Sequence, residues 1–285
     1  MTDLEYHVVD VFTSTAYAGN PLAVVLGGED LSTRQMQAMA RELNLSETTF
    51  PLPVTEPGAD YRLRIFTPGT ELPFAGHPSI GSAWLLHSIG RLDAGERMQE
   101  CGAGVLPVRV DGDGAEITGG PPTLGEPLDA APVLAAVGLS ADDLDARAPA
   151  RWCGTGVEFL MLPVATREAV DRASPDGAAL RDVGQVFLAH WNDGAVYARM
   201  FGAALGIAED PATGSAALGY AVWLAASGLV PGDAQTPYRV EQGFAMGRPS
   251  IMRGVVDTSG GRTVRTRIGG DVVPVASGRI RVPTA

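Results

Sequence analysis

Short apolar and alternating runs recur along the chain, separated by turns rich in Gly, Pro and Asn. Many of these runs contain β-branched and aromatic residues, and apolar segments of this length are typical of strands. The strands expected in this way are 7–12, 22–26, 46–52, 61–66, 105–110 and 116–118, and later 156–164 and 195–201. The C-terminal part is also strand-rich, with turns expected at 259–261, 269–270 and 277–278.

Three segments have helical periodicity. Residues 32–43 begin with Ser32, a good N-cap with Gln35 three residues on, and their apolar positions recur at helical spacing. Residues 79–89 and 212–227 are apolar nearly all round, which predicts helices that are buried on most faces. Gly90 and Gly228 follow them directly, at the position where glycine commonly ends a helix.

The two apolar helices belong to a repeated element. Residues 71–90 and 209–228 align without a gap at an offset of 138 residues, and seven of the twenty pairs are identical. The identical pairs are Glu71/Glu209, Pro73/Pro211, Gly76/Gly214, Gly81/Gly219, Ala83/Ala221, Leu86/Leu224 and Gly90/Gly228. Upstream, Arg64-Ile65-Phe66 pairs with Arg199-Met200-Phe201, and 19–26 falls opposite 156–163. Shared Ala and Gly content is the alternative explanation, but the preserved order of elements favours an internal duplication.

The duplication predicts two similar α/β domains, each a strand-rich unit around one buried helix. Residues 119–132 are rich in Pro and Gly and form the expected linker. We therefore expect one domain at 1–124 and the other at 125–273, facing each other across a cleft. The last residues, 274–285, are expected to pack back on the first domain.

Composition and charge narrow the function classes. The chain has 285 residues and a net charge of −12, a field that repels polyanions, so nucleic acid and anionic membranes are poor partners. The net charge does not exclude a small anionic substrate, because local dipoles can outweigh a diffuse charge. Two separated cysteines and no Cys/His cluster argue against a disulfide scaffold or structural zinc, and no metal site is expected. Neither a signal peptide nor a membrane-spanning run is visible, which predicts a cytoplasmic protein.

The starts of the two apolar helices are candidate anion sites. Gly76-His77 precedes the first, and Thr213-Gly214-Ser215 opens the second. A helix N-terminus offers unpaired N–H groups and a positive dipole end, and glycine allows close approach of a ligand. If the domains face each other, both starts point at the cleft and could hold a carboxylate. Ordinary capping by Ser79 and Thr213 is the alternative.

Three titratable residues are candidates for chemistry, each with a structural alternative. Glu47 lies in a strand-like run, where a carboxylate is either a surface group or a partly buried base with a raised pKa. His77 stands between Gly76 and a proline, either as a structural histidine or as part of the anion site. Asp210 precedes Pro211 in the matching loop, where a turn-forming aspartate is equally expected.

Several segments together resemble the PhzF-like proteins of phenazine biosynthesis, and they follow the order of that family over nearly the whole chain. They are Val9-Asp10-Val11-Phe12, Gly19-Asn20-Pro21-Leu22-Ala23-Val24, Ser46-Glu47-Thr48-Thr49-Phe50, Arg64-Ile65-Phe66-Thr67-Pro68, Glu71-Leu72-Pro73-Phe74-Ala75-Gly76-His77-Pro78, Glu209-Asp210-Pro211-Ala212-Thr213-Gly214-Ser215-Ala216, Glu241-Gln242-Gly243 and Gly247-Arg248-Pro249-Ser250. The resemblance implies an α+β, diaminopimelate-epimerase-like fold with two pseudo-symmetric domains, each a barrel-like sheet around a central helix. It also implies a cofactor-independent enzyme, commonly a homodimer.

The resemblance assigns roles to individual positions. The family's catalytic glutamate matches Glu47, its histidine and aspartate match His77 and Asp210, and its substrate-binding positions match Gly76, Gly214 and Ser215, beside Thr213. Diaminopimelate epimerases place a cysteine at each helix start, whereas Cys101 and Cys153 lie elsewhere in this chain. A two-thiol mechanism is therefore not expected.

The expected activity is that of an isomerase. Glu47 would move a hydrogen within a small unsaturated or cyclic carboxylic acid, in secondary or amino-acid-derived metabolism, and burial would raise its pKa toward neutrality. His77 and Asp210 would orient the substrate or relay a proton. Two alternatives remain open: a C–C lyase or hydrolase that uses the same glutamate, and a small-acid binding protein without turnover.

Overall fold

The computed structural model describes residues 3–284, which divide into two compact units. Unit 1 comprises residues 1–117 and 269–285, and unit 2 comprises residues 118–268. The chain thus passes from one unit to the other twice, a few residues before each of the boundaries expected from the sequence. The Pro- and Gly-rich stretch at 119–132 lies in unit 2, where Gly120 and Gly125 donate backbone hydrogen bonds to Thr155 and Trp152.

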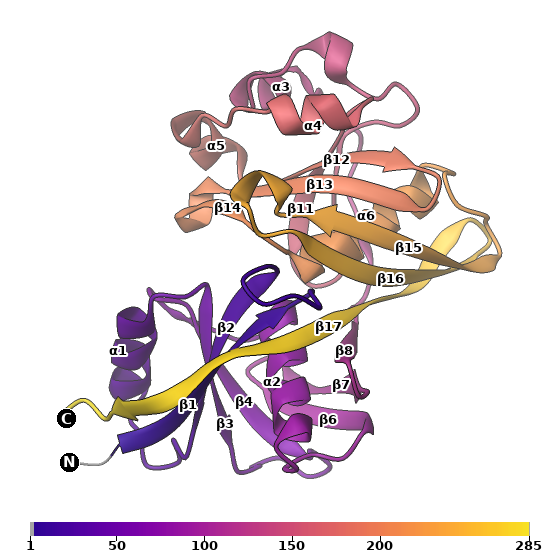
Figure 1. The fold of residues 1–285 in the computed structure, drawn as a ribbon. Coiled ribbons are helices and arrows are strands. Elements are labelled where there is room, and N and C mark those ends of the chain that lie inside the picture. Colours follow the sequence, from indigo (N-terminus) through magenta and orange to yellow (C-terminus); the bar gives the residue numbers. More distant parts are fainter. Residues whose placement is uncertain (1–2, 285) are drawn as a thin grey trace. The chain divides into compact units, whose positions relative to one another are not determined.

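Unit 1 is a barrel-like sheet around a helix (Figure 1). Its elements are β1 Asp3–Val11, β2 Asn20–Leu26, α1 Thr33–Leu43, β3 Glu47–Leu52, β4 Tyr61–Phe66, β5 Glu71–Leu72, α2 Gly76–Ser88, β6 Gly95–Cys101, β7 Gly104–Val110 and β8 Gly114–Thr118, joined by the later part of β17 Arg262–Arg281. Neighbouring strands pair in the order β17, β1, β2, β3, β4, β6, β7, β8, and β8 pairs with β17 again. This closes the sheet.

Unit 2 contains a second sheet and a second buried helix. Its elements are β9 Thr123–Leu124, α3 Ala131–Ala136, β10 Arg151–Gly154, β11 Glu158–Pro163, α4 Arg167–Arg172, α5 Gly177–Val183, β12 Val186–Asn192, β13 Ala195–Gly202, β14 Ile207–Asp210, α6 Gly214–Ala226, β15 Ala234–Gln242 and β16 Ser250–Ser259, with three short 3₁₀ helices. The strands pair in the order β9, β10, β11, β12, β13, β15, β16.

The two units share one pairing scheme, as an internal duplication requires. In each, an antiparallel hairpin is followed by a parallel pair, an antiparallel pair and a second parallel pair (β1–β2, β2–β3, β3–β4, β4–β6; then β10–β11, β11–β12, β12–β13, β13–β15). The same ion pair also recurs. Arg64 binds Glu71 through two hydrogen bonds of 2.7 Å, and Arg199 binds Glu209 through bonds of 2.9 and 2.8 Å.

The central helices are apolar on all sides, as the sequence predicts. Every residue from Gly76 to Leu86 of α2 is buried, and α2 packs against β1, β2, β3 and β7. In α6, Gly214 and the residues from Ala216 to Ala225 are buried, and the helix packs against β9, β10, β11 and β16. A glycine of each helix lies against its neighbours too closely for a side chain: a Cβ on Gly81 would lie 2.7 Å from Leu22, and one on Gly219 would lie 2.9 Å from the Cys153 carbonyl.

The prediction of turns at 269–270 and 277–278 is wrong, because both pairs of residues lie inside the long strand β17. The glycines there allow close approach rather than a turn. A Cβ on Gly269 would lie 2.7 Å from the carbonyl of Ala115, and one on Gly278 would lie 2.9 Å from the Tyr6 ring. The turn at 259–261 is confirmed between β16 and β17. Helices α3, α4 and α5 of unit 2 are not anticipated by the sequence patterns.

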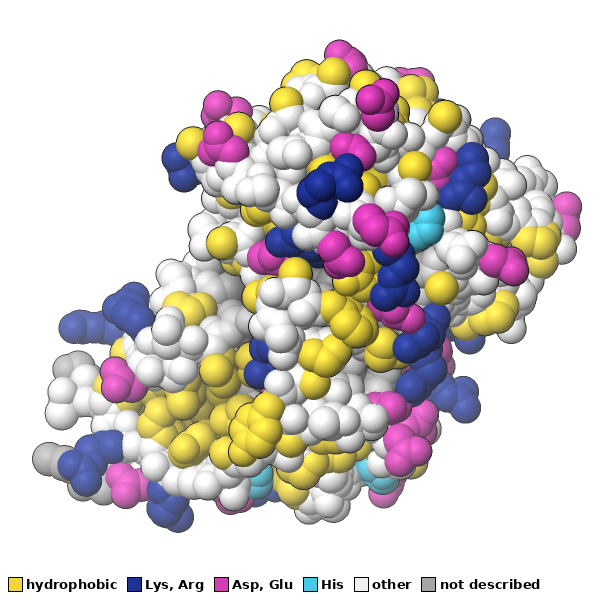
Figure 2. Space-filling model, turned by 45° about the horizontal axis from the view of Figure 1, so that its top comes forward, with side chains coloured by type: hydrophobic (Ala, Val, Ile, Leu, Met, Phe, Trp, Pro, Cys, Tyr) yellow, Lys and Arg dark blue, Asp and Glu magenta, His cyan; other side chains and the backbone are white. Residues whose placement is uncertain are grey.

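Acidic and basic side chains are interspersed on the face shown in Figure 2. Among residues 3–284, no helix is both long and apolar enough to cross a membrane.

Candidate functional site

Glu47 and His77 meet in unit 1. Glu47 is the first residue of β3, where it pairs with Leu22 of the parallel strand β2, and His77 is the second residue of α2. Oε2 of Glu47 lies 3.1 Å from Nε2 of His77, and the two side chains are only 12% and 8% exposed. The surface alternative for Glu47 is thus wrong: its carboxyl group is largely buried beside an imidazole.

The imidazole of His77 is neutral at neutral pH. Burial lowers the pKa of His77 to about 3, against the raising effect of a hydrogen bond to the Pro21 carbonyl. Because Nε2 has no aligned hydrogen bond within residues 3–284, that bond comes from Nδ1–H. The contact with Glu47 has the length of an ion pair, yet it joins a carboxyl group to an uncharged ring. Nε2 of that ring faces the carboxyl group, so the ring can accept a hydrogen bond from the carboxyl group when that group is protonated.

The first turn of α2 has no side-chain cap. Its N-cap residue is Ala75, and the Ser79 hydroxyl donates to the Ala75 carbonyl at 2.9 Å instead of accepting from a helix N–H group. Capping by Ser79 is therefore wrong as an explanation of this polar segment. The N–H groups of Gly76 and His77 belong to the first turn, where the helix itself supplies no acceptors, and the dipole favours an anion.

A buried hydrogen bond joins the two elements that carry Glu47 and His77. The hydroxyl groups of Thr49, on β3, and Ser82, on α2, lie 2.8 Å apart. Thr49 also lies 3.3 Å from the Ala23 carbonyl of β2, to which its hydroxyl donates. Both side chains are fully buried. The strand and the helix are thereby held in register close to the Glu47–His77 contact, a role that the sequence alone did not indicate.

The remaining expected site residues gather at the start of α6 in unit 2. Thr213 is its N-cap residue, Gly214 and Ser215 begin the helix, and Asp210 ends β14 immediately before it. The Thr213 hydroxyl donates to Asp210 Oδ2 at 2.5 Å and does not cap the helix. Capping by Thr213 is therefore also wrong, and Asp210 anchors the loop that precedes the helix.

Gln242 of β15 holds this second helix start. Its side-chain oxygen accepts from the Thr213 backbone N–H at 3.2 Å, and its amide nitrogen donates to the Asp210 carbonyl at 2.7 Å. Gln242 is fully buried. It lies in one of the segments that carry the family resemblance, but nothing in its local sequence indicated this role.

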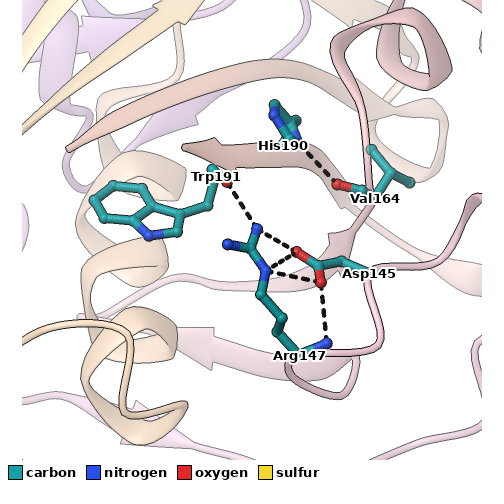
Figure 3. A network of polar contacts seen from close by, with 5 residues as sticks. All are labelled: Asp145, Arg147, Val164, His190 and Trp191. Carbon is teal, nitrogen blue, oxygen red and sulfur yellow. Dashed lines mark hydrogen bonds and ion pairs between the residues drawn. The ribbon is translucent and has the colours of Figure 1, made fainter. Parts of the chain in front are cut away.

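The other histidines have structural contacts. Nδ1 of His190 lies 3.1 Å from the Val164 carbonyl, and Nδ1 of His87 lies 2.9 Å from the Leu92 carbonyl (Figure 3 shows His190). His7 lies 2.8 Å from Glu5 near the surface. These contacts make all three structural or surface residues.

A buried carboxylate of unit 2, Asp145, is already engaged by an arginine. Arg147 Nη2 donates to Asp145 Oδ2 at 2.6 Å and to the Trp191 carbonyl at 2.8 Å (Figure 3). Desolvation raises the pKa of Asp145, but the hydrogen bonds and charge of Arg147 outweigh it, so the pKa lies below its ordinary value. Asp145 is a structural anion rather than a base. Within residues 3–284, no three His, Cys, Asp or Glu side chains gather in a way that could hold a metal ion.

Comparison with known proteins places these features in a family. The model of the PhzC-PhzF family, described as phenazine biosynthesis-like protein, matches residues 9–278. An uncharacterized isomerase of Mesorhizobium japonicum is 37% identical, covering 98% of this chain and 99% of the relative. The trans-2,3-dihydro-3-hydroxyanthranilate isomerase of Pseudomonas aeruginosa is 34% identical, covering 96% of this chain and 98% of the relative.

The fold agrees with that of a solved member. The crystal structure of a phenazine biosynthesis protein of the PhzF family from Bacillus anthracis superimposes with a TM-score of 0.91. The two sequences are 24% identical, and the superposition covers 99% of this chain and 100% of the Bacillus anthracis chain. The expected two-part, barrel-like α/β fold is confirmed.

Proposed function

The chain is an isomerase and belongs to the PhzC-PhzF family of phenazine biosynthesis-like proteins, and from this we propose that it moves a hydrogen between two carbon atoms of a small unsaturated cyclic carboxylic acid. One observation carries the proposal. A largely buried glutamate lies 3.1 Å from a buried, neutral histidine, next to a helix start without a side-chain cap.

Glu47 is the proposed proton carrier. Its carboxylate takes a proton from one carbon of the substrate, the electron pair of that C–H bond moves into the conjugated system, and the carboxylic acid returns the proton to a second carbon. One C–H bond breaks and one forms, so no electrons enter or leave the substrate and no redox cofactor is required. General acid–base catalysis of this kind contributes about 10²–10⁴-fold to the rate.

His77 has a supporting role in this proposal. Its ring is fixed through Pro21, and its Nε2 faces the Glu47 oxygen. A neutral imidazole can accept a hydrogen bond from the protonated carboxyl group after the first transfer, which holds the acidic proton until the second carbon receives it. Because the ring is uncharged, it forms no ion pair with the carboxylate before the transfer.

The helix starts are the proposed carboxylate-binding groups of this enzyme. In unit 1 the N–H groups of Gly76 and His77 lie in the uncapped first turn of α2. In unit 2 Gly214 and Ser215 begin α6, and Asp210 and Thr213 fix the loop before it. Such groups stabilise negative charge without a lysine or arginine, and they can also stabilise charge that develops in the transition state.

A relative supports a proposal for the substrate class. We propose that a dihydro-hydroxyanthranilate or a similar ring acid is the substrate, because a protein that shares 34% of its residues over almost the whole chain is named as the isomerase of trans-2,3-dihydro-3-hydroxyanthranilate.

Product mass provides the test. Incubation with trans-2,3-dihydro-3-hydroxyanthranilate is expected to give a product of unchanged mass and a different ultraviolet spectrum. A product of lower mass would favour the lyase or hydrolase alternative. Ligand-dependent stabilisation without any product from a panel of cyclic and aromatic acids would favour the binding-protein alternative, and the isomerase proposal would then be wrong.

A further inference from the structure

A chain of buried hydrogen bonds leads from the barrel wall of unit 1 to the start of α2. The Tyr61 hydroxyl donates to Gln99 Oε1 at 2.9 Å, and Gln99 Nε2 donates to the Ser79 hydroxyl at 3.0 Å. The Ser79 hydroxyl donates in turn to the Ala75 carbonyl at 2.9 Å. Gln99 and Ser79 are fully buried, and Tyr61 is 6% exposed.

The duplication shows what the fold itself requires at these positions. Tyr61 and Gln99 are register partners in the parallel pair β4–β6, and Val196 and Val240 are register partners in the equivalent pair β13–β15. On the helices, the Ser79 N–H donates to the Ala75 carbonyl, just as the Ala217 N–H donates to the Thr213 carbonyl.

The three polar residues of unit 1 therefore correspond to two valines and an alanine in unit 2. Val196, Val240 and Ala217 are all fully buried, as their counterparts almost are. In unit 2 the equivalent strand pair and the equivalent helix thus form with an apolar cluster at this place. Burying polar groups brings little or no net stability compared with apolar groups of similar shape. Folding alone therefore does not explain the chain of hydrogen bonds from Tyr61 through Gln99 to Ser79 in unit 1.

The hydrogen bonds all run in one direction and end at the peptide group that begins α2. Burial raises the pKa of Tyr61, so its hydroxyl stays protonated and donates. The Ala75 carbonyl accepts from both the Ser79 hydroxyl and the Ser79 N–H. In a planar trans peptide, the N–H of the next residue points the opposite way from this carbonyl. Fixing the Ala75 carbonyl consequently fixes the Gly76 N–H, and donation to the carbonyl makes that N–H a stronger donor.

We propose that Tyr61, Gln99 and Ser79 are positioning residues of the isomerase, which orient the Ala75–Gly76 peptide so that the Gly76 N–H binds the substrate carboxylate. The assignment rests on the proposed function and specifies one of its donors. Tyr61, Gln99 and Ser79 touch no substrate themselves. They act through the peptide that precedes His77.

The decisive variant replaces the three hydrogen-bonded side chains by apolar groups of similar shape: Tyr61→Phe, Gln99→Met and Ser79→Ala together. The probe is 2-amino-3-hydroxybenzoate, the aromatic analogue of the proposed substrate, and its binding is followed by the NMR shift of the Gly76 amide. We expect the triple variant to melt close to the parent protein and to bind the probe at least about tenfold more weakly, as when one hydrogen bond to a charged group is misplaced. With the dihydro acid, kcat/KM is expected to fall in parallel.

Tyr238→Phe is the matched control. Tyr238 is a buried tyrosine of unit 2 whose hydroxyl donates at 3.0 Å to the carbonyl of Ala217, the fourth residue of α6, and not to the peptide group that begins this helix. Its removal is expected to leave the Gly76 response and the probe affinity unchanged. Equal loss in the control variant would show a general effect of removing buried hydroxyl groups and would overturn the assignment.

The other outcomes are equally distinct. A triple variant that folds and binds like the parent would overturn the positioning role and leave the proposed function intact. A triple variant that does not fold would overturn the premise that the barrel of unit 1 forms without these three polar side chains. A parent protein whose Gly76 amide does not respond to the probe would contradict the proposed carboxylate site, and the positioning role would fall with it.

Discussion

Nε2 of His77 lies 3.1 Å from Oε2 of Glu47, although the two residues belong to different elements of unit 1. The sheet brings β3 beside β2, α2 packs against both strands, and the Thr49–Ser82 hydrogen bond holds strand and helix in register. The contact is thus a product of the barrel architecture. It brings together a carboxyl group and a neutral imidazole where the helix dipole favours an anion.

His77 makes stability depend on pH. Its folded pKa is about 3, below the unfolded value of 6.5, so the unfolded chain binds a proton in this range while the folded protein does not. Stability is therefore expected to fall as the pH drops from 6.5 toward 3, with a slope of up to about 1.4 kcal/mol per pH unit from this residue.

Urea unfolding between pH 7.5 and 4.5 measures this slope. The His77→Gln variant should have a flatter profile than the parent protein over the same range. Glu47 faces His77, so Glu47→Gln is compared in the same series. Identical slopes for the parent and His77→Gln would contradict a buried neutral His77.

The repeated ion pairs should differ in strength. Arg199 and Glu209 are 10% and 14% exposed, whereas Arg64 and Glu71 are 18% and 37% exposed. Arg199 also donates to the Ala173 carbonyl at 2.7 Å. Arg199→Met should therefore cost about 3 kcal/mol, as expected when a buried charge loses its partner, and Arg64→Met about 1 kcal/mol or less. Chemical denaturation checks the order, and equal losses would show that burial does not decide it.

The glycines of the two central helices provide another matched pair. The neighbours of a Cβ on Gly81 are the methyl ends of Leu22 and Val11, both at 2.7 Å, while the neighbours at Gly219 include the backbone carbonyl of Cys153 at 2.9 Å. Side-chain ends can move aside and backbone cannot. Gly219→Ala should thus lower the melting temperature more than Gly81→Ala, since the helix-propensity gain of about 1 kcal/mol is the same in both and the strain differs. The reverse order of melting temperatures would contradict the packing described for α6.

The proposed proton transfer predicts the origin of the hydrogen in the product. A protonated carboxyl group that exchanges with solvent between the two proton transfers of one turnover should introduce deuterium at the second carbon when the reaction runs in D₂O. Mass spectrometry of the product is expected to show one added mass unit at that carbon, because a single proton is transferred in each turnover. Product that remains entirely unlabelled would indicate a direct or fully shielded transfer and would contradict an exchangeable carrier.

Much of this architecture could be predicted from the sequence because repetition and periodicity are local signals. The two apolar helices, the glycines that follow them and the order of flanking strands were all visible at a fixed offset. The glycines at 269–270 and 277–278 misled, since glycine serves both turns and close approaches, and only the partner strand distinguishes the two uses.

The site was predictable as residue types but not as geometry. The resemblance indicated Glu47 and His77, yet their burial and their contact depend on how β3 and α2 pack. The hydrogen bonds from Tyr61 through Gln99 to Ser79 are not indicated by any local pattern in the sequence. It becomes visible only when each position is compared with its apolar counterpart in the other unit, and that comparison requires the strand registers.

The central claim is that Glu47 carries the transferred proton, and one comparison tests it most directly. Turnover of trans-2,3-dihydro-3-hydroxyanthranilate is measured for the parent protein, for Glu47→Gln, and for Glu42→Gln as a control at an exposed glutamate of α1. We expect Glu42→Gln to match the parent and Glu47→Gln to lose about 10²–10⁴-fold in kcat while its melting temperature shows a folded protein. Full turnover by a folded Glu47→Gln variant would contradict the account.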